Sequence, residues 1–468
     1  MTEDFYPEDP TLLALYDEDE EDDISLSTGW QARQLKKRQM KNQPVIDKFL
    51  GKGPRTYATA ILPRYYGELL AWALYQKLKR TPWKIVDTLG YREPEPIYSE
   101  VNTGSEKLKL LKGGQILVEN DNDRISITVD INPGYRTSVQ MEGPVENKPG
   151  IDQFVEDVIT IAKDENFYRG KKIEFAGLIH FLNIKDKPWD SIVLDDETKA
   201  EIKSNTVSFL KQSDQWIQYG IPAKRGVLLS GEPGTGKTII CKALMSEADG
   251  ITCITTNAYA LDADGYVTEL YELADDLSPS IVFIEDLDLI GQSRMEFGYH
   301  RGSALLALLA VLDGVEEQKK IVTVATTNFL ESLDKALSQR PSRFDRVIRL
   351  TRPSMQQRRQ IVNRLCRKIP IDENMQEYIS IKADNCTPAQ LQEIIYSLVI
   401  QHTAGQSELS FNKTDVERAI SHINDKNRYQ IGFVVNDNHN GHKLPQIAEN
   451  KFQLPTDGID NEKFTLGL

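Results

Sequence analysis

The sequence predicts an α/β protein in which a parallel sheet carries helices on both faces, with a small helical lid after it and an α+β domain before it. Three observations support this prediction. Strand-like and helix-like segments alternate from Trp189 onwards, which is typical of parallel sheets covered by helices. After RPSMQQRRQIVNRLC the strands stop and helical patterns continue. Between Ile97 and Met141, short strand-like runs are separated by turn signals instead.

Composition places the chain among ordinary globular proteins. It has 468 residues, of which 40% are hydrophobic, and no run of eighteen apolar residues that would predict a transmembrane helix. The N-terminus is acidic, which argues against a secretory or mitochondrial targeting sequence, so we expect a cytoplasmic protein. No CxxC spacing occurs, so we expect buried, apolar thiols rather than a metal site or disulfides at Cys241, Cys253, Cys366 and Cys386.

The net charge of −14 is unevenly placed, with a strongly acidic start to the N-terminal tail, residues 1–42, which we expect to be disordered. Eleven Asp or Glu residues and no Lys or Arg fall between Thr2 and Asp23, and basic residues follow between Arg33 and Lys41. Two interpretations stay open: a solvated tail, or a docking segment for a partner. The acidic balance and the lack of an aromatic, basic surface argue against nucleic acid as a partner.

Residues 43–188 are expected to form an N-terminal α+β domain that binds a substrate or partner. Residues 43–89 have helical spacing, with Pro82 ending the pattern. Strands are predicted in GGQILVEN, DRISITVDI and RTSVQMEG, because GG, DND and NPG turns separate them. A helix in FVEDVITIAKDENFY and a strand-like FAGLIHFLNI follow, and KDKPWD is expected to be a linker.

Residues 189–352 are expected to form the large domain that carries the parallel sheet. Helices are predicted in VLDDETKAEIKSNTVSFLKQ, TIICKALMSEA, YVTELYELADDL and SALLALLAVLDGV, and strands in GVLLSG, ITCITTN, IVFIED and IVTVATTN. Residues 353–427 are expected to form the helical lid, which includes TPAQLQEIIYSLVIQHTA and KTDVERAISHI. Residues 428–468 are polar, with Gly and Asn, and are expected to be irregular.

A phosphate-binding loop lies between GVLLSG and TIICKALMSEA. GEPGTGKT has the pattern G-x-x-x-x-G-K-T in the strand–loop–helix context that this motif requires. Backbone N–H groups of such a loop, together with the helix N-terminus, bind phosphate oxygens. Lys237 is expected to reach the β and γ phosphates of ATP, and Thr238 to ligate Mg²⁺. The predicted nucleotide contacts are Gly231, Glu232, Pro233, Gly234, Thr235, Gly236, Lys237, Thr238 and Ile239.

Acids and one amide follow the neighbouring strands. IVFIEDLDLI supplies Glu285, Asp286 and Asp288 at the end of a buried strand, beside the phosphate loop. Glu285 is expected to hold Mg²⁺ with Thr238, partly through water, and Asp286 to polarise the attacking water. Asn328 ends IVTVATTN and is placed to orient that water against the γ phosphate. The sequence therefore predicts a hydrolytic nucleotide site.

Two arginines, Arg343 and Arg346 in SRFDR, supply guanidinium groups of the kind that stabilise charge on a transferred phosphoryl group. With them the sequence closely resembles the classical AAA ATPases of the AAA+ superfamily. RGVLLSGEPGTGKT, PSIVFIEDLDLI, ATTN and RPSRFDR stand in that family's order and spacing, over roughly residues 189–423. FLKQSDQWIQYGIPAKRG, the Glu-Asp acid order and TPAQLQ are similar to the branch that contains the mitochondrial translocase of the Rieske protein.

The resemblance implies an ATPase that assembles into a homo-oligomeric ring of six or seven subunits, with nucleotide sites at the subunit interfaces. Arg343 and Arg346 would then reach the neighbour's nucleotide. The resemblance also implies a pore-loop aromatic that grips a polypeptide. The matching position is Tyr259, with Tyr266 as the fallback, and ordinary packing of Tyr259 in a loop is an equal alternative.

The chain also departs from this family. The usual Asp-Glu order is Glu285-Asp286 here, so the attacking water is placed by a shorter acid and slow turnover is expected. Ser342 stands where glycine is usual, and Gln339 looks like an insertion, which affects the arginine geometry. The N-terminal domain lacks the membrane helix of the Rieske-translocating branch, so that role is not carried over.

Two hypotheses of function follow from the sequence. The leading one is an ATP-hydrolysing chaperone or unfoldase that remodels, unfolds or translocates protein clients. The alternative is an ATP-dependent oligomeric switch that regulates a bound effector, for example a protease, without threading substrate. The complete set of site residues favours turnover, and the exchanged acids favour slow, switch-like use.

Overall fold

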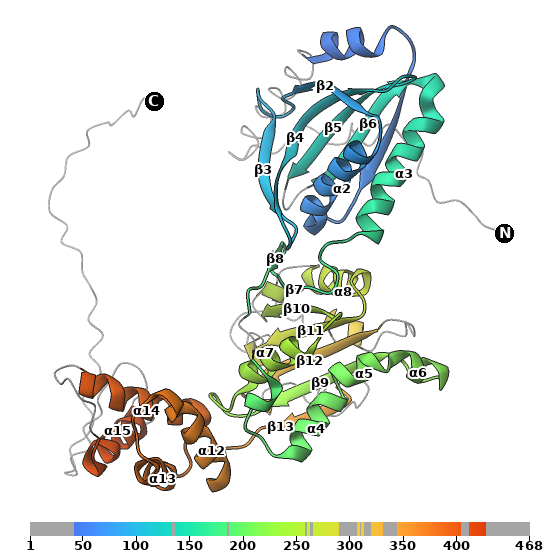
Figure 1. Cartoon of the computed structure of the whole chain (residues 1–468). Helices are drawn as coiled ribbons and strands as arrows, with labels where there is room; N and C mark the ends of the chain where they lie inside the picture. The colour runs from blue at the N-terminus through green and yellow to red at the C-terminus, as the bar shows by residue number, and fades with distance from the viewer. Residues whose placement is uncertain are drawn as a thin grey trace, which may run out of the picture.

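The computed structural model describes residues 42–132, 136–184, 187–257, 260–262, 265–289, 307–308, 310–312, 320–330, 344–403 and 411–426. The two tails, apart from Asn42, and most of the predicted helix SALLALLAVLDGV lie outside these ranges. Figure 1 shows three parts in chain order, which we call the N-terminal module (residues 42–164), the α/β domain (residues 172–350) and the lid (residues 355–426). The fold class that the sequence predicts is confirmed.

The N-terminal module is a six-stranded antiparallel sheet with two helices on one face (Figure 1). The strand order is β1-β6-β5-β4-β2, and β3 also pairs with β4. Ile125, Ile127 and Val129 alternate along β5 and are fully buried, and Ser126 and Asp130 of the same strand are buried as well. The strands are β1 (Arg55–Ile61), β2 (Lys84–Leu89), β3 (Ile97–Asn102), β4 (Lys107–Glu119), β5 (Arg124–Asn132) and β6 (Arg136–Pro144). The helices are α2 (Gly67–Arg80) and α3 (Lys148–Asp164).

The helical expectation for residues 43–89 is wrong in two places. A helix over residues 42–50 and α2 do form, but β1 and β2 are strands. β1 pairs with β6 and β2 with β4, and both partners are distant in sequence. Short segments have weak helix propensity, so sheet hydrogen bonding to distant strands decides their structure.

The α/β domain contains a seven-stranded sheet in the order β13-β9-β12-β11-β10-β7-β8. Every neighbouring pair is parallel except β7 with β8. The strands are β7 (Lys172–Phe175), β8 (Ile179–Phe181), β9 (Lys224–Ser230), β10 (Thr252–Asn257), β11 (Ser280–Glu285), β12 (Ile321–Thr327) and β13 (Arg346–Arg349). The helices are α4 (Asp196–Ser204), α5 (Val207–Lys211), α6 (Ser213–Gln218), α7 (Lys237–Glu247) and α8 (Tyr266–Asp276).

Two strands of this sheet come from the segment that sequence analysis gave to the N-terminal domain. β7 pairs with β10 in parallel, and β8 turns back on β7 as the edge strand. Phe175 at the end of β7 is 1% exposed and contacts Tyr65 of the module, with ring centroids 5.6 Å apart. The chain that leaves the module therefore continues directly into the α/β sheet.

The lid consists of four helices around a core of its own. They are α12 (Met355–Leu365), α13 (Glu373–Lys382), α14 (Pro388–Thr403) and α15 (Lys413–Lys426). Ser354 and Gln357 form a capping box that starts α12, with Gln357 N 3.3 Å from Ser354 Oγ. Leu391, Ile394 and Ile395 on α14 are fully buried, and they anchor the lid core.

The four cysteines are buried free thiols, as the sequence predicts. Burial raises the pKa of the Cys253 thiol to about 12 and raises that of Cys241 further. These thiols therefore behave as small apolar core residues. In the described part of the chain, no helix combines the length and the apolar character that crossing a bilayer requires.

Candidate nucleotide site

The candidate site lies where three parallel strands end. β9 leads into the glycine-rich loop, β11 ends at Glu285, and β12 is followed by Asn328. Ser230 of β9 pairs with Thr327 of β12, and Gly231 N donates to Thr327 O (3.3 Å). The phosphate loop therefore lies at the same edge of the sheet as the polar side chains at the ends of β11 and β12. In open α/β sheets, ligands bind at this carboxyl edge.

The loop has the backbone conformation that phosphate binding needs. Gly234 and Gly236 have φ of +84° and +103°, in the left-handed region that a side chain disfavours. α7 begins at Lys237, directly after Gly236. The glycines thus turn the chain sharply from β9 into a helix whose N-terminus faces the loop, and both features favour an anion.

Lys237 is buried against the loop. Its Nζ donates to Gly231 O (2.6 Å) and Glu232 O (3.1 Å). Burial lowers the pKa of this ammonium, and the carboxylates of Asp286 and Asp288 act in the opposite direction. The lysine is therefore held at the loop as a cation whose desolvation is partly offset by acids that lie nearby.

Glu285 stands beside the first turn of α7. Burial is the main cause that raises the pKa of its carboxyl, and repulsion from Asp286 adds to it. Lys242 and the side chain of Thr238 lower the pKa and oppose that shift. The structure thus brings together the hydroxyl and the carboxylate that the sequence predicted as a pair, and two such oxygen donors match the preference of Mg²⁺.

Asp286 has a left-handed backbone, with φ of +54°. Its N–H donates to Thr326 Oγ1 (3.1 Å), and its Oδ1 accepts a hydrogen bond from Asn328 Nδ2 (3.2 Å). Aspartate tolerates this backbone region better than glutamate, because its short side chain leaves the turn open. Strain at a residue held by several neighbours is a common property of functional sites.

Asp288 is a site residue to which sequence analysis gave no role of its own. Its side chain is 2% exposed, and Oδ1 accepts a hydrogen bond from the backbone N–H of Asn328 (3.0 Å). It therefore fixes the residue that contacts Asp286. The spacing D-x-D after a buried strand is visible in the sequence, but the partner of the second acid depends on sheet order.

A cleft next to the loop was also missed. It lies between the segment before α4, the phosphate loop, the end of β13 and the start of the lid. Asp195 in its wall accepts a hydrogen bond from Thr198 N (2.7 Å), which lowers the pKa of the carboxyl. No local pattern marks these residues, because four distant segments form the wall. The lining residues are Val193, Leu194, Asp195, Thr198, Thr235, Arg349, Leu350, Thr351, Pro353, Gln357 and Pro388.

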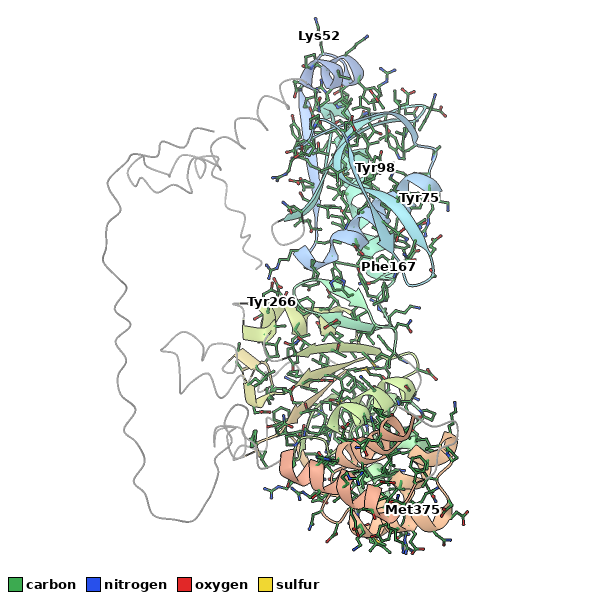
Figure 2. The ribbon with its side chains drawn as sticks, turned by 90° about the vertical axis from the view of Figure 1, so that its left-hand side faces the viewer. Lys52, Tyr75, Tyr98, Phe167, Tyr266 and Met375 are labelled. Carbon is green, nitrogen blue, oxygen red and sulfur yellow. The ribbon has the colours of Figure 1, made fainter. Side chains whose placement is uncertain are left out.

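Four further residues were predicted for the arginine pair and the pore loop. Tyr259 and Arg343 lie outside the described residues. Arg346 is exposed and pairs with Val227 in the middle of β9, several residues before the loop begins. Tyr266, the fallback aromatic, begins α8 and contacts the N-terminal module, with Arg64 stacked on its ring at 4.8 Å. Figure 2 shows Tyr266 at the level where the module meets the α/β domain.

The parallel sheet, the glycine loop at a helix N-terminus and the acids on the next strand together define a nucleotide-binding domain of the phosphate-loop class. Residues 227–352 match the family described as ATPase family associated with various cellular activities (AAA). The match of residues 227–352 confirms the resemblance to the AAA ATPases that the motifs indicate, whereas the similarity to the branch with the Rieske-protein translocase stays a prediction.

Curated relatives match the same half of the chain. A proteasome-activating nucleotidase of Saccharolobus solfataricus is 32% identical over 242 residues, which is 49% of this chain and 61% of the relative. An ATP-dependent zinc metalloprotease FtsH 2 of Sphaerobacter thermophilus is 32% identical over 237 residues, 49% of this chain and 36% of the relative. The FtsH 2 protein of Alkaliphilus metalliredigens is 31% identical over 246 residues. The matches thus span less than two thirds of these relatives.

Proposed function

We propose that this chain binds and hydrolyses ATP. The observation that carries the proposal is the convergence of four groups at one sheet edge: the phosphate loop with Lys237, Glu285 beside Thr238, Asp286, and Asn328. The loop residues 231–239 would hold the phosphates through their backbone N–H groups and the lysine. The cleft lined by Val193, Thr235 and Pro388 adjoins the loop and would receive the rest of the nucleotide.

Thr238 and Glu285 fit a magnesium site, because a hydroxyl and a carboxylate oxygen already face each other there. When bound, Mg²⁺ would neutralise charge on the phosphate oxygens and help to orient them. The raised pKa of Glu285 reflects a carboxylate that its own surroundings stabilise poorly, and such a group gains from a nearby cation. Lys237 would bind the same phosphates from the other side.

Asp286 would polarise the attacking water. Its carboxylate is held by Asn328, and Asn328 is held in turn by Asp288, so the acid and the amide move as one unit. The amide of Asn328 can donate to only a few groups at once, and in this arrangement it would orient the water against the γ phosphate. Aspartate is one methylene shorter than glutamate, which favours slow turnover.

The AAA domain and its relatives support a role in protein remodelling. Those relatives are named as a proteasome-activating nucleotidase and an ATP-dependent zinc metalloprotease, and both names connect a nucleotide with a proteolytic system. We propose a homo-oligomeric ring, of six or seven subunits, that acts on protein clients in the cytoplasm. Arg343 and Arg346 would reach the neighbour's nucleotide. The exposed position of Arg346, away from the loop of its own chain, fits a role across an interface.

The test is steady-state ATP turnover of the full chain beside Asp286→Asn and Lys237→Ala, with the oligomer mass recorded with and without ATP. Turnover by the wild type, binding without hydrolysis in Asp286→Asn and loss of binding in Lys237→Ala would support the proposed roles. An Asp286→Asn variant that hydrolyses ATP as fast as the wild type would overturn the role of that acid. A wild type that assembles with ATP but never hydrolyses it would favour a regulatory switch, and stimulation by unfolded protein would favour the remodelling function.

A further inference from the structure

The connection between the α/β domain and the lid is two residues long. Leu350 belongs to the α/β domain, because its N–H donates to Ser230 O at the end of β9 (2.7 Å). Pro353 belongs to the lid, because its carbonyl accepts a hydrogen bond from Arg358 Nη1 (3.1 Å). Thr351 and Arg352 lie between these anchors. A movement of the lid against the sheet must therefore rotate the backbone at or beside them.

Arg358 makes the lid side of this connection rigid. Its side chain is buried, and besides Pro353 it donates to Ser380 O (3.0 Å) and pairs with Asp384 (3.0 Å). These contacts hold the start of α12, the end of α13 and the turn after α13 together. The turn that leads to Asn385 therefore moves with the body of the lid.

Arg352 spans the connection with one guanidinium. Its Nε and Nη2 both donate to Glu232 Oε2 (2.9 Å and 2.7 Å), and its Nη1 donates to Asn385 O (2.9 Å). Glu232 is the second residue of the phosphate loop, whereas Asn385 belongs to the turn before α14. A side chain from within the hinge thus ties the loop to the lid.

The lid also rests directly on the phosphate loop. Ala389 N donates to Gly234 O (3.2 Å) at the start of α14. A Cβ at Gly234 would lie 2.9 Å from both Thr387 Oγ1 and Ala389 Cβ, so only glycine permits this approach. On the loop side, the carbonyl of Glu232 accepts a hydrogen bond from Lys237 Nζ. A displacement of Glu232 therefore also displaces the lysine. Lid position and loop shape are therefore linked through neighbouring residues.

We infer that Arg352 is a latch, a positioning residue that holds the lid docked on the phosphate loop and thereby sets how tightly the loop retains nucleotide. The nucleotide part of this inference rests on the proposed function, whereas the docking of lid on loop does not. The side chains of Arg352 and Glu232 are 46% and 56% exposed. An ion pair this exposed breaks and reforms easily, as a reversible latch must.

Docking is measured by hydrogen exchange of the full chain without nucleotide, read at the amide of Ala389. Arg352→Ala removes both halves of the latch, and we expect exchange at Ala389 to rise by about threefold or more. Glu232→Gln removes the charge on the loop side alone and should give a smaller rise. Arg359→Ala is the matched control. Arg359 pairs with Glu377 within the lid, both side chains are 52% exposed, and the pair does not touch the loop.

Nucleotide retention is measured by the dissociation rate of a fluorescent ADP analogue and by the KM for ATP. Arg352→Ala should raise both by about 3- to 10-fold, while kcat changes by less than about twofold, because the arginine touches no reacting group. Added salt should raise the KM of the wild type more than that of the variant, since salt screens the exposed ion pair that only the wild type has. Glu232→Gln combined with Arg352→Ala should match Arg352→Ala alone.

The outcomes separate the latch from the proposed function. Equal exchange at Ala389 in Arg352→Ala and Arg359→Ala overturns the latch, whatever the nucleotide measurements give. Faster exchange together with unchanged ADP release and KM overturns its coupling to nucleotide. A wild type that does not bind ATP, in which Arg352→Ala still loosens Ala389, retains the latch and refutes the proposed function.

Discussion

The α/β domain is joined to its two neighbours in opposite ways. On the N-terminal side one hydrophobic core runs through both parts, since Tyr65 of the module, Phe175 of β7 and Val267 of α8 belong to the same buried cluster. On the other side the lid keeps a separate core, against which Val193 of the α/β domain packs. Figure 2 places Phe167 and Tyr266 at the first junction, between the two folded parts.

The polar contacts at the two junctions of the α/β domain differ in the same way as the hydrophobic cores. Arg64 in the module forms a two-point ion pair with Glu269 of α8, with N–O distances of 2.7 Å and 2.9 Å, and both side chains are largely covered. Arg169 holds the other end of the same helix by donating to Asp276 O (3.2 Å). The lid junction relies instead on the half-exposed Arg352.

The difference between the two junctions indicates which part of the molecule moves. A shared hydrophobic core opposes rotation, because any movement would expose packed apolar surface. A two-residue hinge with an exposed ion pair permits it. The module is thus expected to follow the α/β domain as one body, with the lid moving against it.

Phe175→Ala should give the largest effect, because the ring is 1% exposed and lies between Tyr65 and Tyr266. We expect a loss of about 3–5 kcal/mol in the free energy of unfolding, as for other buried Phe→Ala changes. Urea unfolding measures the loss, and hydrogen exchange should rise in the module and the α/β domain together. Faster exchange in the module alone would contradict a single rigid body.

Leu391→Ala is the matching change in the lid, where the side chain is fully buried on α14. The expected loss is about 2–5 kcal/mol, but confined to the lid. Hydrogen exchange should therefore rise in α12–α15 while β9–β12 and the module keep wild-type protection. If α/β protection falls equally, the lid is not an independent unit and the comparison fails.

Arg64→Ala tests the ion pair at the rigid junction. It leaves the covered carboxylate of Glu269 without its partner, and we expect a loss of about 1–2 kcal/mol, between the values for exposed and buried pairs. Arg64→Lys should recover part of it, because lysine keeps the charge but not the two-point geometry. Chemical denaturation measures both variants. A loss no greater than that of Arg80→Ala, whose pair with Glu165 is more exposed, would refute this role.

Asp286→Glu places at position 286 the glutamate that is usual for the second acid in the AAA family, yet we expect it to reduce function. The residue has φ of +54°, where a longer side chain is disfavoured by about 1 kcal/mol. It would also displace the carboxylate from Asn328. Thermal unfolding and kcat measure the two effects. A variant that is both as stable as the wild type and faster would show that the left-handed turn does not select aspartate.

Local patterns predicted the residues of the site better than its architecture. The glycine loop, Glu285, Asp286 and Asn328 each follow a buried strand, and parallel strands bring such positions to one edge. The interaction of Asn328 with Asp286 could be expected for that reason. The left-handed backbone of Asp286 could not, because it depends on the hydrogen bond to Thr326 of a neighbouring strand.

The junctions could not be predicted, since they join segments far apart in the sequence. β7 was recognised as strand-like, but its pairing with β10 joins segments about 80 residues apart, which no local pattern specifies. β1 and β2 were missed because their partners lie on distant strands. The ion pair of Arg352 with Glu232 connects residues 120 positions apart, and although Glu232 belongs to the phosphate-loop motif, nothing around it indicates Arg352 as its partner.

The smallest predicted effect concerns the acids, which belong to the rigid body. Burial raises the pKa of Glu285 above the ordinary value, so the folded state favours its protonated form. The ionised carboxylate therefore costs stability, and this cost is absent below the ordinary glutamate pKa and grows as pH rises through the raised one.

Glu285→Gln removes that cost. Without Mg²⁺ or nucleotide, the variant should unfold at a higher temperature than the wild type at about pH 8, and the difference should shrink towards about pH 4.5. Glu156→Gln, at an exposed position of α3, is the control. The gain in unfolding temperature should appear in the transition that the module and the α/β domain share. Glu285 ends β11, and β11 belongs to the core that these two parts share, which is separate from the core of the lid. A gain confined to the lid, or one that grows as pH falls, would contradict both the electrostatic cause and the division of the molecule into one rigid body and one moving part.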